Sequence, residues 1–591
     1  MSSAPETKTQ EPEHAPIAII GMACVFPGSG SLEQFWQNIV SSVDSIREAS
    51  ESQWDSALYK NRDSFGNIYC SKGGFITEYA EFDPLEFGIM PSSVRGGDPD
   101  QYLALRVAAE ALRDAGYHHK TFNGERAEVI IARAMAPGSG SLNWIQHGQT
   151  VDQVLEILEA ICPDMEASTL TTIADQLKND LPPCNADTIP AVMPNVLSGR
   201  IASKLGFSGR NLVLDAACAS SLIAVETAVH GLHSGLSDLA IAGGVHVNSH
   251  PYFYQMFCEL GALSFSGTIR PFDENADGTI LGEGVGMLVL KRLSDAERDK
   301  NRIYAVIRGV GSSSDGRGGG SLAPNVSGEA LAMSRAYAMA GISPATVELL
   351  EAHGTGTRVG DLAEMKAVQQ IFAADKVNDG RAHRPWCALG SVKSMIGHTQ
   401  AASGMAGLIK SALALYHRVL PPTLNVDKPN ALIDWSQAPC YINSQLRPWR
   451  CGEFTELVHP RRAAVSAFGF GGVNAHAVLE EFHCSDTLKL SSVQNKSKGA
   501  LPKLSLAFPS LNAASLTGIS QLEWQCAQSV DAGNVHLSKQ SNVDHGDTVL
   551  HSFIQTVNAF QKELLYSQES VMISHLEEAD SCAQESQQQQ T

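Results

Sequence analysis

A short strand that runs through a cysteine turn into a helix constrains this fold more than any other segment. Residues 212–214 form an apolar run typical of a buried strand, and residues 222–229 repeat apolar side chains at helical spacing. Cys218 stands between them among small residues that would let a substrate carbonyl approach the sulfur. Unpaired N–H groups and the positive dipole end at a helix N-terminus favour thiolate over thiol. The position suits a nucleophile, but this segment taken alone favours a buried core cysteine.

Three glycine-flanked segments farther along the chain carry further polar side chains. They span residues 351–361, 390–398 and 468–476, and the first two contain His353 and His398. A lone histidine is more often structural than catalytic. Two histidines in similar glycine-flanked turns leave both a structural and a catalytic role open at this point.

Together with the cysteine turn, these segments resemble the β-ketoacyl-ACP synthases, specifically the ketosynthase domains of type I polyketide and fatty-acid synthases. The resemblance runs from about residue 15 to about residue 482, in the family's order. The stretch 140–190 looks most like the polyunsaturated fatty acid, heterocyst-glycolipid and enediyne synthases. Because loops of this length tend to be functional, we expect it to help cover the substrate channel.

Strands and helices alternate in both halves of the chain, which favours largely parallel sheets covered by helices. The resemblance implies an α/β fold of the thiolase-like five-layer αβαβα type with two similar halves. We expect a disordered leader over 1–14, a first half over 15–290 that carries the nucleophile, and a second half over 291–484 that carries both histidines.

The composition becomes polar at about residue 485, which predicts a linker or extension over 485–591. Apolar side chains between Leu550 and Val571 alternate at spacings of three and four residues, which predicts an amphipathic helix at about 548–577. That helix either packs on its own domain or serves as a docking or coiled-coil helix. The Gln-rich tail at 587–591 is predicted to be disordered.

Composition excludes several classes of function. The formal net charge of −20 argues against a nucleic-acid partner. No apolar run is long enough to span a membrane, and the longest helical candidate, 404–416, contains Lys410 and is predicted to be a core helix. The scattered cysteines show no metal-ligand spacing, so we expect no metal. In a chain without an apolar leader they indicate reduced thiols and a cytoplasmic location.

The resemblance implies catalytic roles for three residues. Cys218 would hold the acyl group as a thioester. His353 and His398, both neutral, would donate hydrogen bonds to the enolate oxygen formed when a malonyl thioester loses CO₂. The backbone N–H groups of Cys218 and Phe470 would form the oxyanion hole, and Phe470 would also gate the acyl pocket.

The resemblance also implies supporting residues around this centre. Lys393 would orient the histidines and set their protonation through a carboxylate, with Glu364 as its partner. Thr355 and Thr357 would hydrogen-bond the phosphopantetheine arm of the carrier.

The leading hypothesis is a β-ketoacyl-ACP synthase that catalyses decarboxylative Claisen condensation of a Cys-bound acyl group with malonyl-ACP. We find no acyltransferase Gly-x-Ser-x-Gly motif, carrier serine site or nucleotide-binding glycine loop, so acyl groups would arrive on an acyl carrier protein in trans. The chain itself would bind no cofactor, and the family implies a homodimer.

Two alternatives stay open. The first is a coenzyme A-dependent thiolase-type or starter-unit synthase, although biosynthetic thiolases usually pair histidine with a second cysteine. The second is a non-catalytic ketosynthase-like dimerisation or docking partner that uses the 550–571 helix to organise an assembly.

Overall fold

The computed structural model of the chain describes residues 504–505 and residues 15–483, except 52, 55–58, 60–65, 95, 135–137, 187, 248–249, 318–319, 321, 375–384 and 451–458. The predicted leader, the predicted helix at 548–577 and the Gln-rich tail lie outside the described residues. The division of the chain at 290, 291 and 484 stays a prediction.

Eleven of the described strands form one sheet in the order β13-β11-β10-β15-β16-β9-β1-β8-β7-β5-β6. Their bounds are β1 Ile17–Val25, β5 Ala127–Arg133, β6 Asn211–Leu214, β7 Leu239–His246, β8 Gly284–Arg292, β9 Ala305–Ser314, β10 Leu349–Glu351, β11 Cys387–Gly390, β13 Cys440–Ile442, β15 Arg462–Gly469 and β16 Val473–Glu480. Shorter pairs outside it are β2 Arg47–Glu48 with β3 Lys72–Gly73, β12 Val419–Leu420 with β14 Arg447–Pro448, and β4 Glu81–Phe82 with β17 Leu504–Ser505.

The two halves of this sheet repeat one strand order. The first half reads β6-β5-β7-β8-β1 and the second β11-β10-β15-β16-β9, with β13 added at its outer edge. The first strands of the two halves, β1 and β9, lie antiparallel where the halves join. The repeat confirms the predicted pair of similar halves, which no likeness between their sequences had indicated.

Parallel pairing accounts for only part of the sheet. β5 is parallel to β6 and β7, and β10 is parallel to β11 and β15. β8 and β16 are antiparallel to both of their neighbours. The expectation of largely parallel sheets was therefore wrong. In the second half the reason is the short turn between β15 and β16, since only antiparallel strands can be joined so closely.

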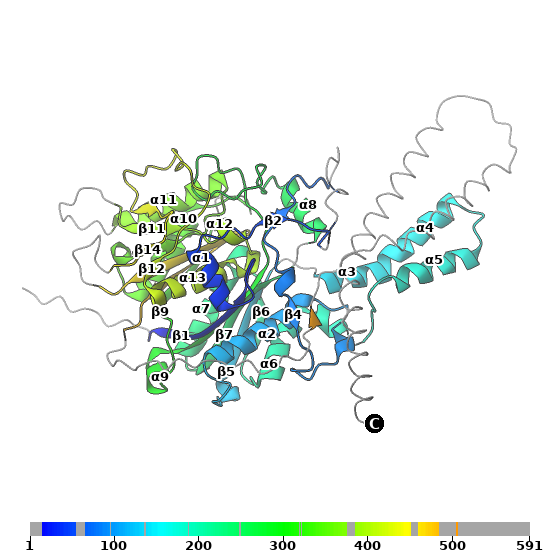
Figure 1. Cartoon of the computed structure of the whole chain (residues 1–591), viewed down its shortest axis with the longest axis horizontal. Helices are drawn as coiled ribbons and strands as arrows, with labels where there is room; N and C mark the ends of the chain where they lie inside the picture. The colour runs from blue at the N-terminus through cyan, green and yellow to red at the C-terminus, as the bar shows by residue number, and fades with distance from the viewer. Residues whose placement is uncertain are drawn as a thin grey trace, which may run out of the picture.

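Helices cover both faces of each half of the sheet. Two of the described helices lie between the halves. Their bounds are α1 Leu32–Val40, α2 Pro99–Asp114, α3 Ser139–Ile145, α4 Val151–Ile161, α5 Ala167–Asn179, α6 Pro194–Leu205, α7 Ser220–His233, α8 Pro251–Glu259, α9 Leu293–Arg298, α10 Val326–Ala340, α11 Arg358–Ala374, α12 Lys393–Ile396 and α13 Ser403–His417. α2 and α6 cover the first half, α10 and α11 cover the second, and α7 and α13 lie between the halves (Figure 1). The arrangement is the predicted five-layer αβαβα fold.

The alternation of side chains along β1 shows how the layers share one strand. Ile17 and Ile19 pack into the central core with α7 and α13, whereas Ala18 and Ile20 pack into the outer core with α2. Successive side chains of a strand point to opposite faces, so a strand buried on both faces reads as a continuous apolar run.

The central helix α13 confirms the prediction of a core helix around Lys410. Residues 403–415 are buried, and Lys410 Nζ lies 2.6 Å from the equally buried carboxylate of Glu351. A charge this deep in a protein requires such a partner. Within the described part of the chain, no helix has the length and apolar character needed to cross a membrane.

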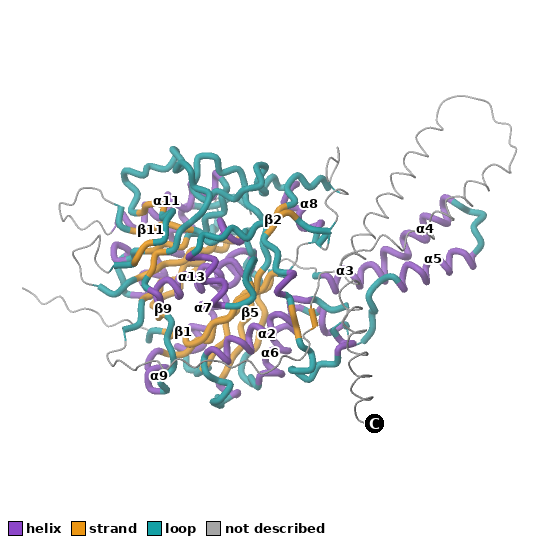
Figure 2. The backbone as a smooth tube through the Cα atoms, in the orientation of Figure 1, coloured by secondary structure: helices purple, strands orange, loops and turns teal. Residues whose placement is uncertain are grey.

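The stretch predicted to cover the substrate channel forms a helical arm instead. α4 and α5 pack against each other and extend away from the layered body, connected to it through α3 (Figures 1 and 2).

Candidate active site

Cys218 lies in the turn that the sequence predicts. β6 ends at Leu214, a 3₁₀ turn spans Ala217–Ala219, and α7 begins at Ser220. Ala217, directly before the cysteine, has φ +48°, a left-handed conformation that is costly for a residue other than glycine. The Ala217 N–H donates to Asp215 Oδ1 at 2.9 Å and the Ser220 hydroxyl donates to the Ala217 carbonyl at 2.6 Å. These bonds hold the strained turn.

Three other predicted residues follow strands of the second half. His353 follows β10, Lys393 follows β11, and Phe470 follows β15. Because β10 is parallel to both β11 and β15, their carboxyl ends meet at one edge of the sheet. His398 follows the short helix α12 and completes this edge.

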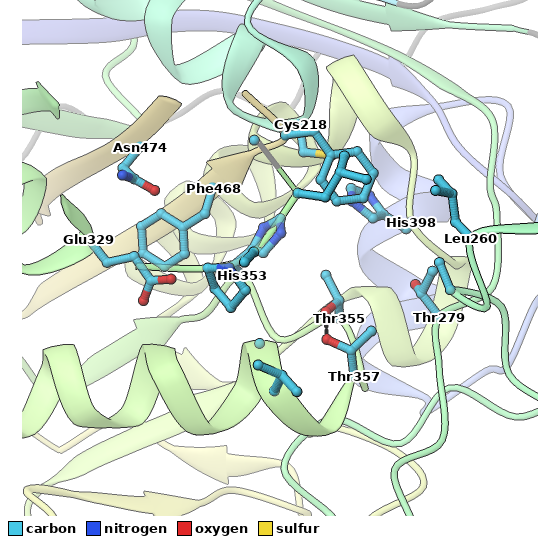
Figure 3. A pocket seen from close by; sticks show the side chains of 18 of the residues that line it. Cys218, Leu260, Thr279, Glu329, His353, Thr355, Thr357, His398, Phe468 and Asn474 are labelled. Atoms are coloured by element: carbon cyan, nitrogen blue, oxygen red, sulfur yellow. Dashed lines mark hydrogen bonds between the residues drawn. The ribbon is translucent and has the colours of Figure 1, made fainter. Parts of the chain in front are cut away.

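One cavity of about 260 Å³ brings the predicted catalytic side chains together. Its lining includes Cys218, His353, His398, Phe470, Thr355 and Thr357 (Figure 3). The two imidazole rings lie 5.4 Å apart, centre to centre, at 83° to each other. No residue of the helical arm lines this cavity, so the expectation that the arm covers the channel was wrong. The reason is that α4 and α5 contact each other and extend away from the layered body (Figure 1).

A glycine turn presses against the cysteine turn from the other side. A Cβ added to Gly469 would overlap the carbonyl oxygen of Ala216 and lie 3.2 Å from the backbone nitrogen of Cys218. Gly471 and Gly472 have φ +85° and +74°, which glycine adopts without strain. This approach brings the Phe470 N–H to the sulfur of Cys218.

Burial dominates the acidity of the cysteine. It raises the pKa of Cys218 to about 12, while the charge of Lys393 and hydrogen bonds from the N–H groups of Phe470 and Cys218 lower it only in part. The thiol is 5% exposed and points its proton to Gln400 Oε1 at 3.5 Å. The expected thiolate at the helix N-terminus is therefore not the resting form, since desolvation outweighs the helix dipole.

The two histidines are neutral. Burial and the charge of Lys393 hold the pKa of both His353 and His398 well below the usual value. His398 Nδ1 accepts the Gln400 N–H at 3.2 Å, so the proton of the neutral ring lies on Nε2. His353 Nδ1 is buried without a hydrogen-bond partner among the described residues. The arrangement gives the cavity an N–H donor from His398.

Glu364 and Lys393 lie behind the cavity wall. The Glu364 carboxyl accepts the backbone N–H groups of His353 and Gly354 at 2.7 and 2.8 Å. It therefore holds the backbone that carries the first imidazole. Lys393 is 3% exposed; burial lowers its pKa, and the charges of Glu351 and Glu364 oppose that shift. Lys393 acts on both histidines through its charge.

Thr355 and Thr357 lie side by side in the lining. Their hydroxyl oxygens are 3.0 Å apart. Asp361 fixes the turn between them, because its carboxyl accepts the backbone N–H of Gly356 at 3.2 Å and of Phe272 at 2.6 Å.

Sequence reasoning missed several residues of the site. Gln400, which contacts both the cysteine and His398, lies alone in a run of small residues and gave no signal. Glu329, Phe468 and Asn474 also line the cavity. Among the described residues, no three His, Cys, Asp or Glu side chains are grouped so that they could hold a metal ion.

Two family models match the chain. The model described as the N-terminal domain of β-ketoacyl synthase matches residues 14–296, and that described as the C-terminal domain matches residues 304–427. One polyunsaturated fatty acid synthase polypeptide from Thraustochytrium sp. is 38% identical over 477 residues, which are 79% of this chain and 16% of the relative. Polyketide synthase GfsB of Streptomyces halstedii is 38% identical over 471 residues, 79% of this chain and 8% of the relative. The chain thus spans less than a fifth of the length of either relative.

Solved structures agree with these matches. The ketosynthase from module 6 of the bacillaene synthase of Bacillus subtilis is similar with a TM-score of 0.67 and 33% identity, over 80% of this chain and 73% of that chain. An oxazolomycin ketosynthase domain from Streptomyces albus has the same TM-score of 0.67 at 30% identity, over 82% of this chain and 76% of that chain.

Proposed function

The chain belongs to the β-ketoacyl synthase family of condensing acyltransferases, and from this premise we propose that it joins a Cys218-bound acyl group to malonyl-ACP by decarboxylative Claisen condensation. One observation carries the proposal. A buried thiol and two neutral imidazoles that lie more than a hundred residues from it in the sequence line one cavity.

The first half-reaction transfers the acyl group from a carrier thiol to Cys218. The sulfur bonds to the thioester carbon, the bond to the carrier sulfur breaks, and the proton of the Cys218 thiol ends on the departing carrier thiol. The oxyanion that forms would accept hydrogen bonds from the N–H groups of Cys218 and Phe470, each worth about 3–4 kcal/mol in related acyl transfers. The charge of Lys393 favours the thiolate during transfer.

The second half-reaction makes the carbon nucleophile. A malonyl thioester loses CO₂, and the electrons of the broken C–C bond form an enolate whose oxygen accepts hydrogen bonds from His398 Nε2 and from His353. The enolate carbon then attacks the acyl carbonyl and expels Cys218, which recovers a proton from solvent. The product is a β-ketoacyl thioester on the carrier.

The substrates and partners belong to this proposal. The acyl and malonyl groups would arrive on the phosphopantetheine of an acyl carrier protein in trans, with the arm held at Thr355 and Thr357, and the chain would act as a homodimer. Relatives named as polyunsaturated fatty acid and polyketide synthases support a product of either class.

The alternatives find less support. Of the described residues that line the cavity, Cys218 alone is a cysteine, whereas a thiolase-type reaction would use a second one. A vestigial, non-catalytic site would have no need to retain the thiol, both imidazoles and the buried Lys393 in one place.

Replacing His398 distinguishes the two half-reactions, because each can be assayed separately in the same variant. We expect His398→Ala to retain acylation of Cys218 from an acyl-carrier thioester and to lose release of CO₂ from carboxyl-labelled malonyl-ACP, because only the second step uses the imidazole. His417→Ala, on the far end of α13, should retain both steps. Unchanged CO₂ release in the His398 variant would contradict the proposal.

A further inference from the structure

A carboxyl group that the proposed chemistry does not use lies in the wall of the active-site cavity. Glu329 belongs to the first turn of α10, and its side chain is 1% exposed. It lines the same cavity as Cys218 and His353. In the view of Figure 3 it lies on the other side of His353 from Thr355 and Thr357. A substrate that reaches the sulfur therefore meets polar groups on two sides of the imidazole.

One oxygen of the Glu329 carboxyl has no hydrogen-bond partner in the described part of the chain. That oxygen is Oε2, and it is buried. Two polar residues of the same wall satisfy each other instead, since Asn474 Nδ2 donates to Asp315 Oδ1 at 2.6 Å. A buried polar group without a partner is unfavourable, and native structures keep few of them unless a ligand or function requires it.

Glu329 is neutral at physiological pH. Burial, together with the nearby charges of Glu364 and Asp315, raises its pKa to about 9. A protonated carboxyl offers one O–H donor and retains acceptor capacity. It can therefore bind a hydroxyl or a ketone, and it does not repel the carboxylate of a malonyl thioester.

Apart from Glu329, Asn474 and Asp315, this part of the lining includes several apolar residues. They are Leu322, Ala323, Pro324 and Phe468, the last of which lies beside Glu329 in the view of Figure 3. Because Asn474 and Asp315 bond to each other, Glu329 is the polar group of this wall left without a hydrogen-bond partner among the described residues, and such a group can fix the orientation of a mostly hydrocarbon ligand. The complementary ligand is an acyl chain that carries a single oxygen function.

We propose that Glu329 binds a hydroxyl or ketone substituent on the acyl chain that is transferred to Cys218, so that the site selects oxygenated acyl thioesters over saturated ones. The inference rests on the proposed function, because it assumes acyl transfer to Cys218. A site that hydrogen-bonds a substrate oxygen discriminates against the analogue without it, since the buried partner is then left unpaired. We expect a preference of about tenfold or more.

The test compares two acyl-pantetheine thioesters of equal chain length, one with a 3-hydroxyl group and one saturated. The rate of Cys218 acylation is measured by peptide mass for the wild-type chain, Glu329→Gln and Glu329→Leu. The wild type should prefer the hydroxyacyl substrate by about tenfold or more. Glu329→Gln, which keeps a donor and an acceptor, should retain the preference, and Glu329→Leu should lose it.

Several results would overturn the inference. Equal wild-type rates with the two substrates would do so, as would an unchanged preference in Glu329→Leu. An equal loss for both substrates in that variant would assign the carboxyl to the pantetheine arm and overturn the proposed acyl contact. If Glu329→Leu does not fold, a preference lost in Glu329→Gln contradicts the proposal and a retained one supports it. Absence of any acylation of Cys218 in the wild type would instead refute the proposed function, and this inference with it.

Discussion

At the scale of single residues, the site depends on groups that burial keeps neutral. Cys218 retains its proton, and His353 and His398 lack a charge, because desolvation penalises their charged forms more than the neighbouring groups favour them. Neutral imidazoles suit hydrogen-bond donation to an enolate oxygen. The neutral thiol implies that only a small fraction of Cys218 is thiolate at neutral pH.

The acidity of Cys218 predicts an unusual pH dependence of alkylation. Because its pKa is raised to about 12, the thiolate fraction should increase about tenfold for each pH unit throughout the accessible range. We expect the rate of Cys218 labelling by iodoacetamide, followed by peptide mass, to rise steadily from pH 7 to above pH 9 without a plateau. A plateau near the pKa of an ordinary thiol would contradict this account of the buried sulfur.

The sequence allowed most residues of the site to be predicted, because their turns resemble the ketosynthase motifs and follow one another in the family's order. Cys218, His353, His398, Phe470 and the two threonines do line one cavity, although their roles stay predictions. Gln400 and Glu329 could not be predicted, because no local pattern marks either residue and because Cys218, which Gln400 contacts, lies 182 residues away in the sequence. The protonation of the thiol could not be predicted either, because it depends on burial by distant elements.

At the scale of elements, the packing of two turns sets the geometry of the proposed oxyanion hole. The turn between β15 and β16 contacts the turn between β6 and α7 where Gly469 has no side chain. Any Cβ at this position would force the Phe470 N–H away from the sulfur.

We therefore predict that Gly469→Ala loses acylation of Cys218 by about a hundredfold, the scale of removing one oxyanion donor. The variant should also unfold at a lower temperature. Gly148→Ala, where an added Cβ meets nothing within 4 Å, is the matched control and should leave acylation unchanged. An unchanged rate of Cys218 acylation in Gly469→Ala would show that acylation does not depend on the close approach of the two turns.

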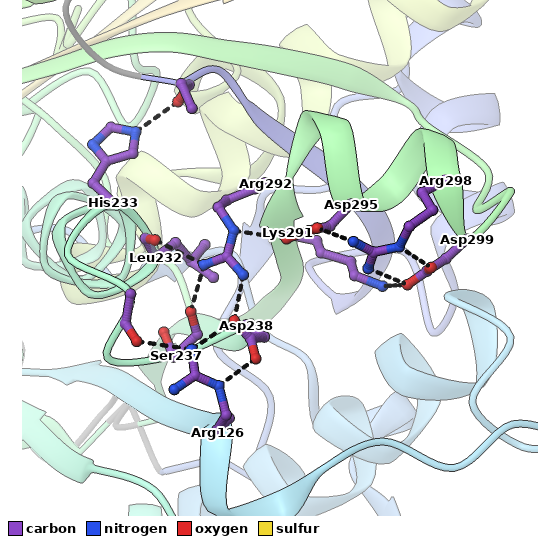
Figure 4. A network of polar contacts seen from close by, with 12 residues as sticks. Arg126, Leu232, His233, Ser237, Asp238, Lys291, Arg292, Asp295, Arg298 and Asp299 are labelled. Carbon is purple, nitrogen blue, oxygen red and sulfur yellow. Dashed lines mark hydrogen bonds and ion pairs between the residues drawn. The ribbon is translucent and has the colours of Figure 1, made fainter.

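A network of ion pairs ties β8 and α9 to neighbouring elements (Figure 4). Arg292 at the end of β8 pairs with Asp238 and Asp295, and it donates to the carbonyls of Leu232 and Ser237 at 2.9 and 2.8 Å. Arg298 pairs only with carboxylates among the described residues and is 65% exposed. Arg292 therefore bonds to both carboxylates and backbone carbonyls, whereas the more exposed Arg298 bonds to carboxylates alone among the described residues.

Replacing each arginine with methionine separates these contributions. Arg292→Met should lower the free energy of unfolding by about 2–3 kcal/mol, because two backbone carbonyls lose a partly buried donor. Arg298→Met should have a much smaller effect, since solvent screens exposed ion pairs. Denaturant unfolding of both variants measures the two losses in free energy of unfolding and shows which is larger. A larger loss for Arg298→Met would contradict it.

At the scale of the whole molecule, the repeated strand order explains where the site lies. Each half places the carboxyl ends of its parallel strands toward the joint cavity, so one half supplies Cys218 and the other supplies the histidines. Alternation of strands and helices in the sequence was sufficient to predict an α/β fold. The antiparallel strands β8 and β16 and the projecting arm could not be read from alternation, because strand direction and loop placement depend on packing between distant segments.

The lining of the cavity predicts the effect of removing the polar extension. All of its lining residues lie between Cys218 and Asn474. A chain truncated after Ser485 should therefore acylate Cys218 from a small soluble thioester at the full-length rate. A lower rate with acyl-ACP alone would assign carrier docking to the extension, whereas loss of acylation from both substrates would contradict the independence of the site.

The central claim is that Cys218 carries the acyl group, and the mass of the protein after reaction with an acyl-carrier thioester tests it most directly. The account predicts one added acyl group on the wild-type chain, located on the Cys218 peptide and discharged by malonyl-ACP. Cys162→Ala should behave in the same way, and Cys218→Ala should remain unmodified while still folded. An acyl group on another residue, or a Cys218→Ala chain that still forms the β-ketoacyl product, would contradict the account.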